Sequence, residues 1–134
     1  MRLHVLAAIG LLVCAVASAK AQLADAQIDA AFAKADTDKS GTVGLSEASK
    51  FNITVDMFRK ADVSKHAALD KKGFADAIRY QFAWANTDHD DTLDWKEASK
   101  AGIKSKKIFD AVDSDHDGTL DLAEYVAALV AQAK

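Results

Sequence analysis

Twelve residues near the C-terminus, Asp113 to Glu124 (DSDHDGTLDLAE), carry the clearest chemistry in the chain. Oxygen-bearing side chains occupy the first, third, fifth, ninth and twelfth positions of this segment, and Gly118 occupies the sixth. A hard cation such as Ca²⁺ takes about six to eight oxygen ligands at about 2.3–2.6 Å. A loop of this length provides them when alternate side chains point inward, the backbone turns sharply at position 6, and a bidentate Glu closes the shell. The segment therefore predicts a Ca²⁺-binding loop, in which Thr119 at position 7 contributes its backbone carbonyl.

The pattern of this segment, here called loop four, occurs three more times. Loop one (residues 36–47) retains three of its five acidic positions and loop three (residues 86–97) retains four, the closing Glu among them in both. Loop two (residues 62–73) is degenerate, because Ala67 replaces the turn glycine and Gly73 replaces the closing Glu. A phenylalanine stands four residues before each loop: Phe32, Phe58, Phe82 and Phe109. This fixed offset predicts an internal repeat of helix–loop–helix units.

Loops one, three and four differ in how many carboxylates they offer. Their predicted ligands are Asp36, Asp38, Ser40, Thr42, Glu47, Asn86, Asp88, Asp90, Thr92, Asp94, Glu97, Asp113, Asp115, Asp117, Thr119, Asp121 and Glu124. Side-chain carboxylates number three in loop one, four in loop three and five in loop four. Because ligand charge tunes affinity, we expect loop four to bind most tightly, then loop three, then loop one. Loop two lacks the bidentate closure and is not expected to bind.

The loops resemble those of the EF-hand family. The loops start only 26, 24 and 27 residues apart. In this spacing, and in residues 69–85 (LDKKGFADAIRYQFAWA), the chain resembles the compact exported EF-hand proteins of the lanmodulin type. The three intact loops predict about three bound Ca²⁺ ions, and the resemblance to lanmodulin makes lanthanide ions the alternative. Lanmodulin loops carry proline at position 2, where this chain has Thr37, Val63, Thr87 and Ser114. That departure favours calcium as the ligand.

The segments between the loops predict an all-α fold. The chain has no proline, and alanine-rich stretches favour helix. We expect four helix–loop–helix units arranged as two pairs that share one continuous central helix, residues 71–85. Tyr80 and Trp84 lie four residues apart on this helix, and they form a candidate partner-binding face beside a core-facing row.

Short exit helices are expected after loops one and three. Asn52 and Gly102 should interrupt them, and Thr54 and Ser105 are predicted N-caps of the helices that follow. Although loop two is degenerate, its residues 68–69 should still pair with loop one.

Residues 1–21 have the outline of a secretory signal peptide: a basic start, an apolar run and small residues, with cleavage after Ala19 or Ala21. An uncleaved anchor and a lipoprotein site at Cys14 are alternatives. The remaining residues 22–134 are expected to form a single domain in the periplasm or outside the cell. Because Cys14 is the only cysteine, this domain has no disulfide, and bound metal would stabilise its fold instead.

These features predict an exported calcium-binding protein that acts as a buffer or sensor. The alternatives are a lanthanide binder and a protein-interaction module whose metal only staples the fold. The net charge of −3 argues against a nucleic-acid partner. No catalytic residues are predicted, because no nucleophile–base pair stands out. Metal ions are the expected partners, and no membrane association is expected once the signal is removed.

Overall fold

The computed structural model describes residues 22–133. After a first helix over residues 22–35, the elements are β1 (Val43–Gly44), α2 (Leu45–Ser49), α3 (Val55–Ala61), β2 (Ala68–Leu69), α4 (Lys71–Ala85), α5 (Trp95–Lys100), α6 (Lys106–Val112) and α7 (Leu122–Gln132). The prediction of an all-α fold is confirmed, and the two strands form only a short ladder between loops.

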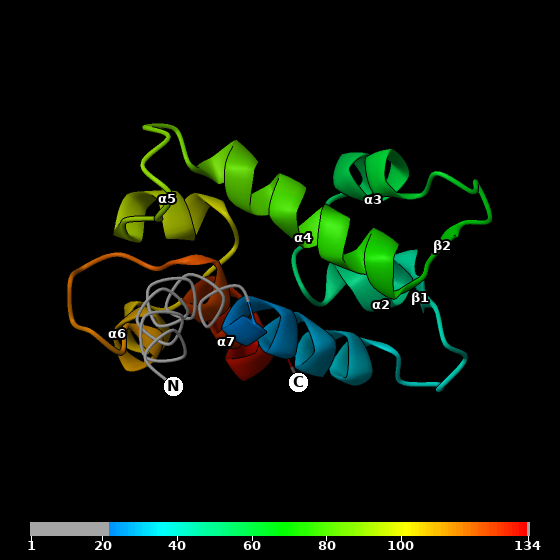
Figure 1. Cartoon of the computed structure of the whole chain (residues 1–134), viewed down its shortest axis with the longest axis horizontal. Helices are drawn as coiled ribbons and strands as arrows, with labels where there is room; N and C mark the ends of the chain where they lie inside the picture. Colours follow the sequence, from blue (N-terminus) through cyan, green and yellow to red (C-terminus); the bar gives the residue numbers. More distant parts are fainter. Residues whose placement is uncertain (1–21, 134) are drawn as a thin grey trace, which may run out of the picture.

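Helix α4 lies between two ends of the molecule. Figure 1 shows loops one and two at one end of the long axis and loops three and four at the other, with α4 running between them. Helix α4 packs against α3, α5 and α7, as expected of a helix shared by both pairs. Two ion pairs also join it to the first helix: Lys71 to Asp29 at 2.9 Å, and Arg79 to Asp25 at 3.1 Å.

Within each pair, the two loops are joined by their backbones at position 8. Strands β1 and β2 pair antiparallel, with Val43 opposite Leu69. In the second pair, Leu93 and Leu120 each donate a backbone N–H to the other's carbonyl at 2.8 Å. All four of these side chains are fully buried. The prediction that degenerate loop two still pairs with loop one is therefore confirmed.

The predicted N-caps begin the helices where the sequence indicated. The Thr54 hydroxyl accepts a hydrogen bond from the Met57 N–H at 3.2 Å, and the Ser105 hydroxyl accepts one from the Lys107 N–H at 3.2 Å. A cap of this kind contributes about 1 kcal/mol by satisfying a backbone donor that the helix leaves free.

The two predicted helix breaks meet in space. Asn52 has φ of 60° and Gly102 has φ of 104°, so both adopt the left-handed conformation that ends a short helix. The Asn52 Nδ2 donates to the carbonyl of Gly102 at 3.1 Å, and Gln132 Nε2 donates to the same carbonyl at 2.6 Å. This contact joins the two loop pairs, and we call it the junction. Beside it, the buried Tyr125 hydroxyl donates to the Ala101 carbonyl at 3.0 Å.

Aromatic pairs fill the core toward both ends of α4. Phe74 contacts Phe32 and Phe51 at ring-centroid distances of 5.6 and 5.8 Å, and Phe82 contacts Tyr125 at 5.6 Å. The core is thus continuous from one loop pair to the other through α4.

The predicted signal peptide and its cleavage site lie outside the described residues. Across residues 22–133, none of the helices has both the length and the apolar character that crossing a membrane requires.

Candidate metal-binding loops

Three groups of carboxylates come together, one in each of loops one, three and four. Within each group, one oxygen from every member lies within 4.8 Å of the others. The groups are Asp36, Asp38 and Glu47; Asp88, Asp94 and Glu97; and Asp113, Asp115 and Glu124. Carboxylate oxygens are the hard donors that Ca²⁺ prefers, so the residues present fit such an ion. Each group includes the predicted closing Glu.

The side chain at position 1 closes each loop from inside. Asp36 accepts hydrogen bonds from the N–H groups of Ser40 at 3.0 Å and Gly41 at 2.9 Å. Asp113 accepts the corresponding pair in loop four at 3.3 and 3.0 Å. In loop three, Asn86 accepts one such bond, from the Asp90 N–H at 3.4 Å. An amide has a single oxygen, so Asn86 holds its loop by fewer bonds than an aspartate does.

Positions 4 and 6 have positive φ in all four loops. These residues are Lys39, Gly41, Lys65, Ala67, His89, Asp91, His116 and Gly118. A residue with a Cβ at such a position costs roughly 1 kcal/mol relative to glycine. In loop three, Asp91 adopts φ of 71° at position 6. Ala67 adopts φ of 58°, so degenerate loop two keeps the backbone course of the other loops at that cost.

The closing Glu is held by hydrogen bonds to both of its oxygens. In loop three, Glu97 Oε2 accepts from the N–H of Thr87 at 2.8 Å and from its hydroxyl at 3.1 Å. The other oxygen, Oε1, accepts from the Asp94 N–H at 3.1 Å. The carboxylate therefore stands across the loop opening, fixed at position 2 on one side and at position 9 on the other.

Loops one and four repeat this arrangement. Thr37 donates to Glu47 Oε2 from its N–H and its hydroxyl, both at 3.0 Å. Ser114 donates to Glu124 Oε2 in the same way at 3.0 and 3.1 Å. This role of position 2 was not predicted from the sequence, in which these residues stood out only because they are not proline. A usable signal was present, because the three loops with a closing Glu have Ser or Thr at position 2, whereas loop two, which lacks that Glu, has Val63.

Position 9 starts the exit helix. The Asp94 side chain accepts from the Glu97 N–H at 2.8 Å, and the Asp121 side chain accepts from the Glu124 N–H at 2.9 Å. The N–H of position 9 in turn donates to Oε1 of the Glu, so each of these helices begins with a capping box. Gly44 has no side chain to accept such a bond, so α2 has only the return bond from its N–H to Glu47 Oε1 at 3.0 Å.

The other predicted ligands lie in the loops but outside the three groups. They are Ser40, Thr42, Asn86, Asp90, Thr92, Asp117, Thr119 and Asp121. Asp90 and Asp117, at position 5, accept from the N–H of the position-7 residue at 3.1 and 2.9 Å, respectively. Their role as ligands stays a prediction.

Desolvation, neighbouring carboxylates and hydrogen bonds shift pKa values in loop four. Desolvation is the largest influence that raises the pKa of Asp115, and hydrogen bonding to Asp113 and the charges of Asp117 and Glu124 raise it further. Hydrogen bonds from the backbone and side chain of Thr119 lower the pKa of Asp117. A cation placed among these carboxylates would lower the pKa of Asp115.

The corresponding carboxylates of loop three shift in the same directions. Desolvation and the neighbouring Asp90 raise the pKa of Asp88, and the Thr92 N–H lowers the pKa of Asp90. For Glu97, desolvation is the largest single influence and raises the pKa. The hydrogen bonds from Asp94, Thr87 and Asp88 together outweigh it and lower the pKa.

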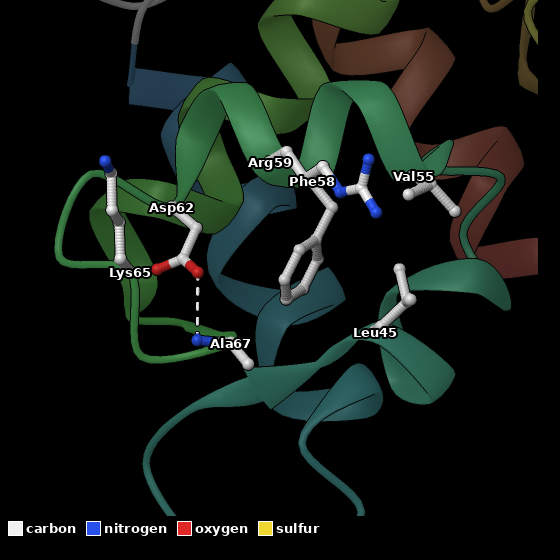
Figure 2. A pocket seen from close by; sticks show the side chains of 7 residues that line it. All are labelled: Leu45, Val55, Phe58, Arg59, Asp62, Lys65 and Ala67. Carbon is white, nitrogen blue, oxygen red and sulfur yellow. Dashed lines mark hydrogen bonds between the residues drawn. The ribbon is translucent and has the colours of Figure 1, made fainter.

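Loop two contributes to none of the acidic groups found among residues 22–133. Its Asp62 still accepts a hydrogen bond from the Ala67 N–H at 2.9 Å (Figure 2). Next to this loop is a cavity of about 470 Å³. Figure 2 shows Leu45 and Val55 facing one another across it from α2 and α3, with the Phe58 ring between the helices and the loop.

The predicted partner-binding residues on α4 lie partly at the surface. Trp84 is 50% exposed, and Lys100 Nζ lies 4.4 Å from the centre of its ring. Tyr80 is partly buried, and Lys60 Nζ lies 4.6 Å from its ring centre. Each ring is thus covered on one face by a lysine of this chain. Recognition of a partner by these rings stays a prediction.

Comparison with known proteins points in the same direction as the loops. The family model described as "EF hand" matches residues 28–51 and 106–130, which contain loops one and four. No curated protein matches at a significant level. Among solved structures, a homolog of programmed cell death 6 protein from Leishmania major Friedlin is similar, with 18% sequence identity and a TM-score of 0.34. The match covers 69% of this chain and 64% of that protein, so this chain spans less than two thirds of its length. The two family matches, together with the acidic groups in the loops, support an EF-hand calcium-binding family for this chain.

Proposed function

We propose that this protein binds three Ca²⁺ ions, in loops one, three and four, and acts outside the cytoplasm as a calcium buffer. The observation that carries the proposal is the gathering of carboxylates in these three loops and not in loop two. The residues that would hold the ions are the predicted ligands of the three loops. A bound ion would balance the negative charges of these carboxylates.

The scarcity of methionine favours a buffering role over a sensing role. Calcium sensors of the EF-hand type open a methionine-rich groove when they bind the ion. Here Met57 is the only methionine in residues 22–133, and it packs against the core. The export part of the proposal rests on the signal-like residues 1–21.

Calorimetric titration of the chain without residues 1–21 tests the proposal. We expect three Ca²⁺ ions per chain, with affinities inside the EF-hand range of roughly 10⁻⁷ to 10⁻³ M. Glu47→Gln, Glu97→Gln and Glu124→Gln should each weaken one site and leave the other two. Four strong sites, or no binding, would refute the proposal.

A parallel titration with La³⁺ addresses the lanthanide alternative. Some preference for a trivalent ion is expected, because loop four offers five carboxylates. A preference of many orders of magnitude would replace calcium by lanthanide as the ligand.

A further inference from the structure

The hydroxyl at loop position 2 occurs in this chain only together with the closing Glu. Thr37, Thr87 and Ser114 each place a hydroxyl within 3.0–3.1 Å of a Glu Oε2. In loop two, both partners of this contact are missing, because Val63 stands at position 2 and Gly73 at position 12. The Val63 side chain is instead 87% exposed.

We propose that Thr37, Thr87 and Ser114 are positioning residues that hold the closing Glu of each loop ready to bind the ion. The proposal rests on the proposed calcium binding. It assigns to these hydroxyls a function that none of the loop ligands performs, since each hydroxyl contacts the carboxylate and not the ligand oxygens at positions 1 and 3.

The physical reason lies in the length of the Glu side chain. A glutamate loses much rotamer freedom when it is fixed in one place, and that loss opposes binding. Hydrogen bonds to the carboxylate limit this freedom before the ion arrives, as partners of ligand side chains do in metal sites generally. The backbone N–H of position 2 remains in every variant, so the hydroxyl can be removed by itself.

Loop three is the best place for the test, because Trp95 lies within it and contacts Phe109 of the adjoining helix at 5.6 Å. The variants are Thr87→Val, which keeps the shape but loses the hydroxyl, and Thr87→Ser, which keeps the hydroxyl. Val63→Thr in loop two is the matched control, because there is no Glu for its hydroxyl to hold. Circular dichroism of each variant checks that the helices form.

For Thr87→Val we expect calcium affinity at loop three to fall about three- to tenfold, which is what a typical hydrogen bond contributes net of its exchange with water. Calcium dissociation, followed by Trp95 fluorescence after mixing with a chelator, should quicken by a similar factor. Thr87→Ser should restore both quantities to within about twofold of the wild type, and Val63→Thr should change neither. Equal affinities for wild type and Thr87→Val would overturn the proposal.

A measurement without metal separates this proposal from the function on which it rests. In the chelator-treated full chain, Thr87→Val should free Glu97 and so speed hydrogen exchange of the Asp94 amide, which donates to Glu97 Oε1. Unchanged exchange at Asp94 would count against the positioning role even if the wild type bound no Ca²⁺. Conversely, faster exchange with no calcium binding in the wild type would refute the proposed function alone.

Discussion

The junction between the two loop pairs makes a sharp prediction for Gly102→Ala. A Cβ at residue 102 would lie 2.6 Å from both the Cβ and the Cγ of Asn52. Such distances are far inside van der Waals contact, so one of the two residues must move. The backbone at Gly102 also has φ of 104°, which an alanine adopts only with strain.

The expected loss of stability has three parts. Placing alanine at this φ costs about 1–2 kcal/mol. Overpacking against Asn52 costs about 1–3 kcal/mol. The hydrogen bond from Asn52 Nδ2 to the Gly102 carbonyl, worth about 1 kcal/mol, is also at risk. We expect Gly102→Ala to lower the free energy of unfolding by about 3–6 kcal/mol, a large part of what a domain of this size retains.

A double-mutant cycle isolates the steric part. Asn52→Gly removes the side chain that alanine would meet, and glycine is at ease at the φ of 60° found there. That single change should leave the free energy of unfolding nearly unchanged, because relief of the backbone strain at residue 52 offsets the lost hydrogen bond. The double variant Asn52→Gly/Gly102→Ala should lose only about 1–2 kcal/mol, since the backbone strain at residue 102 remains.

Urea unfolding followed by tryptophan fluorescence in excess Ca²⁺ measures all four proteins. Neither residue belongs to a loop, so the contribution of bound calcium is common to them. Effects that add to within about 0.5 kcal/mol would refute the reasoning, since they would show that the two residues do not meet.

Four further predictions follow from the loops. Glu124→Gln should weaken calcium binding at loop four more than any other single ligand change there, by removing a charged bidentate ligand; calorimetry with Asp121→Asn as the comparison measures this. A chelator should lower the melting temperature, because each site stabilises the folded chain by about 2.7 kcal/mol at a hundredfold excess of Ca²⁺ over Kd; an unchanged melting curve would show that metal does not hold the fold. When a chelator removes the metal, the stability that Glu47 and Glu97 contribute should be present above their ordinary pKa and be lost as pH falls through their lowered folded-state pKa values. Asp88 and Asp115 have raised pKa values, so their contributions to stability change with pH in the opposite sense. The acid-unfolding curves of Glu47→Gln and Asp115→Asn should therefore shift in opposite directions from that of the wild type. Ala67→Gly should stabilise the protein by up to about 1 kcal/mol by relieving the positive φ in loop two, with no change in the number of bound ions.

Much of the fold could be predicted from the sequence because its signals are local. The caps at Thr54 and Ser105, the breaks at Asn52 and Gly102, and the continuous α4 each depend on residues within a few positions of one another. The loop spacing likewise predicted which closing Glu would reach the acidic residues at positions 1 and 3 in loops one and four.

Other features depend on contacts that no local pattern specifies. The meeting of Asn52 with Gly102 joins residues 50 apart in the chain, and it follows from how the pairs pack around α4. The hydroxyls at position 2 were not predicted because a Ser or Thr there is also an ordinary exposed loop residue. Only its link with position 12, ten residues later, gives it a role.

Helix α4 gives the molecule a further property, which concerns how it opens. The helix leaves loop two at Lys71 and enters loop three after Ala85, and no linker separates the two pairs. Phe74 packs in the core of the first pair, and Phe82, eight residues later on the same helix, packs in the core of the second. Opening either half would expose the buried α4 side chains that pack against it. Because both halves share this helix, their slowest amide hydrogens should exchange at the same rate. An ion captured by loop four would then slow exchange in α3, at the opposite end of the protein, without touching it.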